Sequence, residues 1–206
     1  MLLAINPHNP QPRLIKQVVE ALRLGAVICY PTDTVYGIGC DIFNQKAVKR
    51  IYQIKQRPMK KPFSFICADL KDVSVYAHVS NAGYRVMRKC LPGPYTFVLG
   101  ATKLVPKIMM TKQKTVGIRV PEQQICMDLV RGLGNPILTT SATPDDLDDS
   151  PLINACEVEE RYGKQVDWII DGGPLSYSAS STVVALEEAE LKVLRLGKGN
   201  LENLGL

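Results

Sequence analysis

Apolar residues recur at helical spacing in several segments of the chain, and each segment is bounded by a residue that suits a helix end. Gly25 and Gly134 follow two of these segments, and glycine is common just past the last turn of a helix. Asn44 precedes another, and its side chain can cap the first turn. Helices are therefore predicted over residues 13–24, 44–54, 81–91, 122–133 and 152–162.

Short runs rich in β-branched and aromatic residues stand between these segments and end in polar turns, as buried strands do. Strands are predicted over residues 26–31, 35–40, 63–68, 95–99, 115–120, 136–140, 166–170, 182–186 and 191–196. Residues 70–76 fit either element, and residues 103–114 are irregular. Because helices and strands mix without strict alternation, we expect one α/β domain, residues 1–206, built on a large twisted mixed sheet.

Composition agrees with a folded globular chain. Of the 206 residues 46% are hydrophobic, and the formal net charge of +5 fits phosphate-bearing ligands or RNA without requiring either. Six cysteines lack zinc-ligand spacing, and several lie in apolar runs, which indicates buried thiols in a reducing compartment. No apolar run approaches the ~18 residues of a membrane span, so a cytoplasmic location and no membrane partner are expected.

Several classes of enzyme are disfavoured by missing motifs. His8 and His78 are the two histidines, and neither accompanies a nucleophile motif of a hydrolase. The chain has no Walker-type phosphate loop, and Gly37 and Gly39 lack the third glycine of a dinucleotide-binding fingerprint. This glycine pair is better explained by close packing within a strand.

Hydroxyls and cations gather instead at the predicted ends of strands and helices. Lys55, Arg57 and Lys61 follow a predicted helix, and Pro58 turns the chain away from helical conformation there. Taken alone, this stretch also fits a solvated basic loop. Together with hydroxyls elsewhere, the cations could form a pocket for phosphate or carboxylate. The candidate residues are Thr32, Thr34, Lys55, Arg57, Lys61, Thr115, Arg119, Thr139, Ser141, Ser181 and Arg195.

Six ordered motifs resemble one known family. They span residues 31–40, 55–58, 92–96, 116–121, 140–142 and 181–184. In this order they are similar to the YrdC-like family of threonylcarbamoyl-AMP synthases, and most similar to its YciO branch, with a match from about residue 12 to about residue 197. The resemblance implies an open sheet with a positively charged concave face.

The resemblance also implies a nucleotidyltransferase reaction. Threonine, bicarbonate and ATP, with Mg²⁺ on the triphosphate, would give threonylcarbamoyl-AMP and pyrophosphate, and a separate transferase would pass the threonylcarbamoyl group to tRNA. By motif position, ATP would be bound by Lys55, Arg57, Lys61, Thr115, Ser141 and Arg195, with Lys55 and Arg57 as the catalytic pair. Threonine would be bound by Thr32, Thr34, Arg119, Thr139 and Ser181.

Two positions depart from the pattern of the synthases. Thr143 stands where they carry asparagine, and Ile66 stands where some carry histidine. Threonine cannot replace the paired donor and acceptor of an amide. An alternative function therefore stays open: the same fold could bind double-stranded RNA or tRNA, or act in RNA or ribosome maturation, with weak or altered synthase activity. Residues 144–151 form an acidic stretch that we expect to be a solvated loop.

Overall fold

Helices and strands follow one another along the chain in the computed structural model, which describes residues 1–143, 151–176, 179–187 and 190–205. The helices are α1 (Pro12–Arg23), α2 (Gln45–Ile54), α3 (Leu70–Tyr76), α4 (Asn81–Cys90), α5 (Gln124–Leu133) and α6 (Ala155–Tyr162), with single 3₁₀ turns at Lys107–Met109 and Glu202–Leu204. The strands are β1 (Leu2–Ala4), β2 (Ile28–Tyr30), β3 (Gly37–Asp41), β4 (Ser64–Ile66), β5 (Ala77–His78), β6 (Tyr95–Ala101), β7 (Thr115–Arg119), β8 (Ile137–Ser141), β9 (Trp168–Asp171), β10 (Thr182–Glu187) and β11 (Glu190–Arg195).

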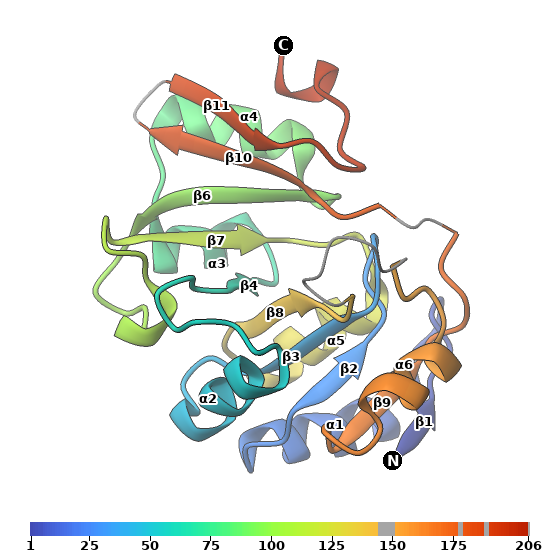
Figure 1. The fold of residues 1–206 in the computed structure, drawn as a ribbon. Coiled ribbons are helices and arrows are strands. Elements are labelled where there is room, and N and C mark those ends of the chain that lie inside the picture. The colour runs from blue at the N-terminus through green and yellow to red at the C-terminus, as the bar shows by residue number, and fades with distance from the viewer. Residues whose placement is uncertain (144–150, 177–178, 188–189, 206) are drawn as a thin grey trace.

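Within the described residues the strands form one mixed sheet in the order β1-β9-β2-β3-β8-β4-β7-β6-β10-β11, with β5 pairing along β6 (Figure 1). The sheet contains parallel pairs such as β4–β7 and β6–β10 and antiparallel pairs such as β3–β8 and β6–β7. The fold class predicted from the sequence, one α/β domain with a large mixed sheet flanked by helices, is confirmed. The domain bounds of 1–206 stay a prediction.

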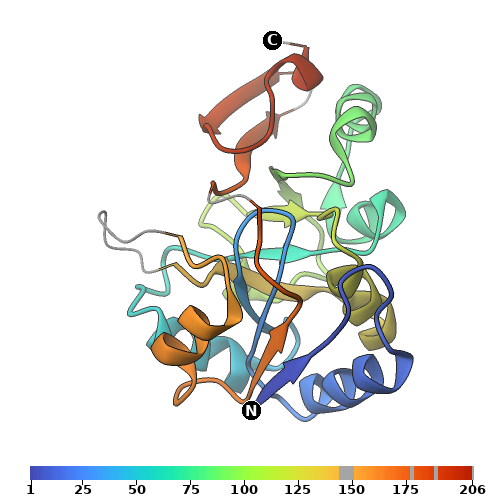
Figure 2. The ribbon, with the colours of Figure 1, turned by 90° about the vertical axis from the view of Figure 1, so that its right-hand side faces the viewer.

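The helices are divided unequally between the two faces of the sheet. Helices α1, α3, α4 and α5 lie on one side, and α2 and α6 lie on the other, where α2 contacts β3 and α6 contacts β9 (Figures 1 and 2). The second pair therefore covers the half of its face that contains β3 and β9. The other half, made by β4, β6, β7 and β10, carries the side chains described below.

Local sequence explains where the helices begin and end. The Asn44 side chain accepts a hydrogen bond from the Ala47 amide, so it caps α2 as predicted. Gly134 ends α5 in the left-handed conformation, with φ of 82°, and its amide donates to the Val130 carbonyl. The buried faces of α1 and α5 pack together, and a Cβ on Gly132 would lie only 2.9 Å from Val19 Cγ2.

A few elements differ from the prediction. Strands β1 and β5 were not predicted, and the ambiguous residues 70–76 form α3, whose first turn is capped by the Asp69 side chain. Helix α6 begins at Ala155, three residues later than predicted, because the Asn154 side chain accepts from the Glu157 amide and fixes the first turn there. Of the predicted acidic loop, residues 144–150 lie outside the described residues.

Candidate functional site

Strand register gathers small and polar side chains on the face of the sheet away from α3 and α4. Ser64 on β4 lies opposite Thr139 on β8, and Gly117 on β7 lies opposite Val98 on β6. Directly opposed residues project to the same face, so these four residues line one surface. They form part of the floor of a cavity of about 470 Å³.

Three guanidinium groups converge on this cavity, from Arg57, Arg119 and Arg195. Burial lowers the pKa of Arg195, and the neighbouring charges of Arg119 and Arg57 lower it further. Among the described residues, the Nε atoms of Arg57 and Arg119 are buried without a hydrogen-bond partner. Mutually repelling cations with unused donors form a site that an anion would stabilise.

Arg57 reaches the cavity because the chain turns sharply after α2. The helix ends at Ile54, Gln56 takes a left-handed conformation with φ of 48°, and the Arg57 amide donates to the Tyr52 carbonyl. The guanidinium then lies over the Phe63 ring, 4.8 Å from its centroid. This cation–π contact holds the side chain without neutralising its charge.

Lys55 lies beside the cavity and does not line it. Its side chain is buried, and Nζ donates to the Ser141 carbonyl at 3.2 Å and to the Thr143 carbonyl. Lys55 thus fixes the backbone that follows β8, where Ser141 itself lines the cavity. The phosphate contact predicted for this lysine stays a prediction.

Arg119 is paired with a carboxylate. Its Nη2 donates to Asp33 Oδ1 at 2.8 Å and to Thr34 Oγ1 at 3.1 Å. The Thr34 hydroxyl lies 3.0 Å from that of Thr32, which donates to the Val35 carbonyl at 2.6 Å. The polar turn after β2 is thereby tied to the end of β7, although about 85 residues separate them in the chain.

The glycines at 37 and 39 make room for Tyr30. A Cβ on Gly39 would lie 2.8 Å from the Tyr30 ring, and one on Gly37 would lie 3.4 Å from it. The Tyr30 hydroxyl donates to Thr139 Oγ1 at 2.9 Å and so orients a predicted site residue. The expectation that this pair serves close packing is supported by these contacts.

Ser181 connects two parts of the site. Its hydroxyl lies 2.8 Å from Thr96 Oγ1, and its carbonyl accepts from Arg195 Nη2 at 2.9 Å. Thr96 was not among the predicted site residues, although it ends a motif on which the family resemblance rests. A threonine within an otherwise apolar predicted strand was the available signal, and in the structure this residue is buried.

The cavity brings together most of the predicted site residues: Thr34, Arg57, Lys61, Arg119, Thr139, Ser141, Ser181 and Arg195. Thr32 lines a second cavity. Thr115 does not line the first cavity, but its hydroxyl lies 2.7 Å from the hydroxyl of Thr111, which does. Hydroxyl-bearing residues that line the cavity but were not predicted from the sequence are Ser64, Thr96, Thr111, Thr140 and Ser180.

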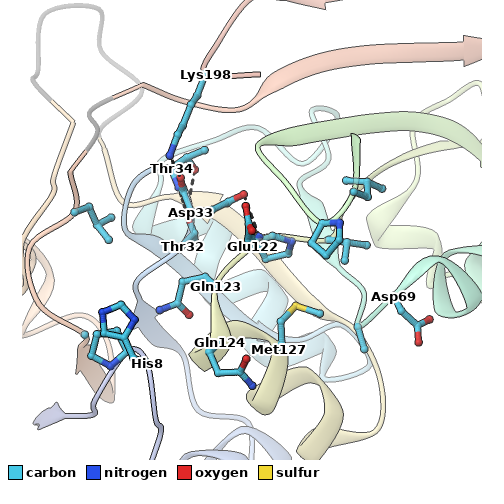
Figure 3. A pocket seen from close by; sticks show the side chains of 18 of the residues that line it. His8, Thr32, Asp33, Thr34, Asp69, Glu122, Gln123, Gln124, Met127 and Lys198 are labelled. Atoms are coloured by element: carbon cyan, nitrogen blue, oxygen red, sulfur yellow. Dashed lines mark hydrogen bonds between the residues drawn. The ribbon is translucent and has the colours of Figure 1, made fainter. Parts of the chain in front are cut away.

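The second cavity, of about 1040 Å³, lies on the other side of the turn at Asp33 (Figure 3). Its polar groups are largely engaged within the protein. The Asp33 carboxylate contacts Arg119 and the Glu122 amide, the Gln123 side chain caps α5, and Lys198 donates to the Asp33 carbonyl. The smaller cavity is lined by three arginines and, among the described residues, by no carboxylate, so it is the better candidate for an anion site.

Neither thiol nor metal chemistry competes for this site in the part of the chain that the structure describes. Five cysteines are buried and Cys156 is exposed, and burial raises the pKa of the Cys29 thiol to about 12. No cluster of three or more His, Cys, Asp or Glu side chains could hold a metal ion among the described residues.

None of the described helices is long and apolar enough to cross a membrane.

An open mixed sheet with an arginine-lined cavity defines an α/β protein with a candidate site for anionic ligands. The family model described as telomere recombination, that of Sua5, YciO and YrdC, matches residues 20–197, and the chain belongs to this family. The predicted resemblance is confirmed. YciO of Escherichia coli K12 is 42% identical over 201 residues, covering 96% of each chain. A putative threonylcarbamoyl-AMP synthase of Methanocaldococcus jannaschii is 32% identical over 200 residues, covering 95% of this chain and 92% of the other.

Solved structures of the same family have a similar fold. The crystal structure of E. coli YciO has a TM-score of 0.92 at 40% identity, covering 99% of this chain and 98% of the other. That of Pyrococcus abyssi Sua5 complexed with L-threonine has a TM-score of 0.91 at 28% identity and covers 99% of this chain and 59% of the other. The fold therefore spans both the YciO and the Sua5 branches of the family.

Proposed function

We propose that this protein is a threonylcarbamoyl-AMP synthase-type nucleotidyltransferase, which uses threonine, bicarbonate and ATP and supplies a transferase that modifies tRNA adenosine. The observation that carries the proposal is the unequal pairing of the three cavity arginines. Arg119 has a carboxylate partner, whereas Arg57 and Arg195 have none among the described residues. The cavity thus has one compensated end and one strongly cationic end.

Each end suits one substrate. At the compensated end, Arg119 donates to the Thr34 hydroxyl, and the hydroxyls of Thr96, Thr139 and Ser181 line the same cavity, so together they can orient a small amino acid carboxylate. At the cationic end, Arg57, Lys61 and Arg195 can hold the phosphates of ATP. The relative crystallised with L-threonine supports an amino acid substrate in this fold.

The reaction then needs little covalent chemistry from the protein. The threonine nitrogen attacks the carbon of bicarbonate, water leaves, and N-carboxythreonine forms. Its new carboxylate oxygen attacks the α-phosphorus of ATP, and the bond from that phosphorus to the bridging oxygen of the β-phosphate breaks to release pyrophosphate. Arg57 and Arg195 stabilise the negative charge that develops on the phosphates, which is how positioned cations accelerate phosphoryl transfer.

Mg²⁺ would enter with the triphosphate, because the described residues offer no cluster of carboxylates for it and Mg²⁺ commonly binds through substrate phosphates and water. When bound, it would neutralise phosphate charge. The protein groups that would share this task are Arg57 and Arg195, which line the cavity and would bind the phosphates.

Two positions bear on the choice of amino acid. Thr143 replaces the asparagine of the synthases, and its carbonyl is held by Lys55. Ile66 is fully buried and lies opposite Arg119 in the β4–β7 pair, so the threonine end receives an apolar side chain where some synthases carry histidine. We therefore include serine and valine beside threonine as test substrates.

The experiment is pyrophosphate release from ATP, measured with threonine and bicarbonate and with each omitted in turn. Arg57→Ala and Arg195→Ala are each expected to lower kcat/KM by about 10- to 100-fold, the effect of losing one charged hydrogen-bonding group of about 1.5–3 kcal/mol. Arg88→Ala, an exposed position on α4, is the matched control and is expected to leave the rate unchanged. Release that requires no amino acid, or equal rates in all variants, would contradict the proposal.

A second candidate, binding of double-stranded RNA, rests on exposed lysines around the rim of the same cavity. Lys61 lines the cavity and Lys60 precedes it, and Lys112 and Lys114 lie between the lining residue Thr111 and the start of β7. RNA binding through these lysines should weaken steeply as salt rises. Tight binding that is insensitive to salt would count against it.

A further inference from the structure

Asp33 occupies the wall between the two cavities and has no assigned role. Its side chain is 6% exposed, its Oδ1 accepts from Arg119 Nη2 at 2.8 Å, and its Oδ2 accepts from the Glu122 amide at 3.2 Å. Its backbone carbonyl accepts from Lys198 Nζ at 2.7 Å (Figure 3). The residue is thus fixed from three directions, by β7, by the segment before α5 and by the segment after β11.

The ion pair fixes the orientation of the Arg119 guanidinium. Nη2 is committed to Asp33 and Thr34, whereas Nε is buried and has no partner among the described residues. Arg119 lines the arginine-lined cavity, and Asp33 lines the other one. The carboxylate therefore holds the guanidinium from the side of the second cavity, while Arg119 itself lines the arginine-lined cavity, where a ligand would bind.

The charges of the three cavity arginines also favour a carboxylate beside Arg119. The charges of Arg119 and Arg57 lower the pKa of Arg195, so the three cavity arginines repel one another. A carboxylate behind Arg119 offsets part of that repulsion without occupying the cavity. Removing it would leave a buried cation without its partner, and such a side chain tends to change conformation.

We propose that Asp33 is a positioning residue that orients Arg119 to receive the carboxylate of the amino acid substrate. The proposal rests on the proposed function for the identity of that substrate. The orientation of Arg119 by Asp33 is independent of it and can be measured without any ligand.

The kinetic test compares Asp33→Asn with Asp167→Asn. Asp167 is a matched control because its carboxylate also accepts from an arginine, Arg50 at 2.6 Å, and from a backbone amide, that of Val27 at 2.8 Å, and it does not line the arginine-lined cavity. Asp33→Asn is expected to raise the KM for threonine about tenfold or more, as for loss of a charged hydrogen bond, and to leave the KM for ATP unchanged. Equal increases in both KM values, no increase, or the same change in Asp167→Asn would overturn the proposal.

Nitrogen-15 spectra of the arginine side chains test the same inference without turnover. The Arg119 Nε–H signal, assigned by its loss in Arg119→Lys, is expected to be sharp in the wild type and in Asp167→Asn because the guanidinium is held. In Asp33→Asn it should broaden or shift. An unchanged signal in folded Asp33→Asn protein would overturn the proposal. Absence of pyrophosphate release from the wild type, with the signal behaving as expected, would instead refute only the proposed function.

Discussion

A methyl group placed at Gly117 tests whether the arginine-lined cavity is the ligand site. A Cβ there would meet Ser64 Oγ and would lie 3.2 Å from Ser64 Cβ and 3.3 Å from Thr96 Cγ2. The Ser64 hydroxyl can rotate away, but the other two contacts require the strands to move by a few tenths of an ångström. Overpacking of this kind costs about 1–3 kcal/mol. Alanine restores about 0.4–1 kcal/mol by restricting the unfolded chain.

The net loss of about 1 kcal/mol should lower the Tm of Gly117→Ala by about 2–4 °C in a domain of this size. The ligand effect should be larger, because the methyl group lies on the cavity floor. Thermal unfolding with and without ATP and threonine measures both quantities. The wild type is expected to gain stability with ligand. Gly117→Ala should gain little or none.

Gly132→Ala provides the matched control for this experiment. Its Cβ would lie 2.9 Å from Val19 Cγ2, where α1 packs on α5 on the other side of the sheet. This variant should show a comparable steric effect on Tm and keep the full ligand-induced increase. If Gly117→Ala also kept the full increase, ligand would have to bind elsewhere and the assignment of the cavity would be wrong.

Two further predictions concern buried hydroxyl and thiol groups. Tyr30→Phe removes the hydrogen bond to Thr139 and should cost about 1 kcal/mol of stability. It should also raise the KM for threonine more than the KM for ATP. Equal effects on both KM values would show that Thr139 does not contact the amino acid. Burial raises the thiol pKa from 9.0 to about 12 for Cys29 and to about 11 for Cys90, so the folded state retains protons that the unfolded state loses. The contribution of these thiols to stability should therefore be constant below pH 9.0 and fall as pH rises toward these values. Urea midpoints measured on both sides of pH 9.0 would detect the fall. A flat profile would show that the thiols do not titrate on unfolding.

Much of the fold could be predicted because its signals are local. The cap at Asn44 and the left-handed Gly134 are encoded by residues next to the helices that they bound. Strand β1 had no such signal: it is three residues long, and its partner β9 lies more than 160 residues away. The same holds for the two-residue strand β5, which exists through its pairing with β6.

The residue types of the candidate site could be predicted from the sequence. The contacts that these residues make with one another could not. Polar residues at strand ends indicated which side chains would meet, and the cavity brings most of them together. The pairing of Arg119 with Asp33 depends on a contact across 86 positions. A carboxylate between two threonines in the first motif was the available signal for Asp33. The packing of Lys55 against backbone carbonyls required the conformation of the chain after β8, which no local pattern encodes.

The order of strands in the sheet determines when the cavity can form during synthesis on the ribosome. Arg195 lies on β11, which joins the sheet through β10, and β10 pairs with β6, whose residues are made about 87 positions earlier. A nascent chain without β10 and β11 holds Arg57 and Arg119 but not Arg195. The three-arginine cavity therefore forms only after β11 has been made, so a shorter nascent chain would lack one of the three cations proposed to bind ATP.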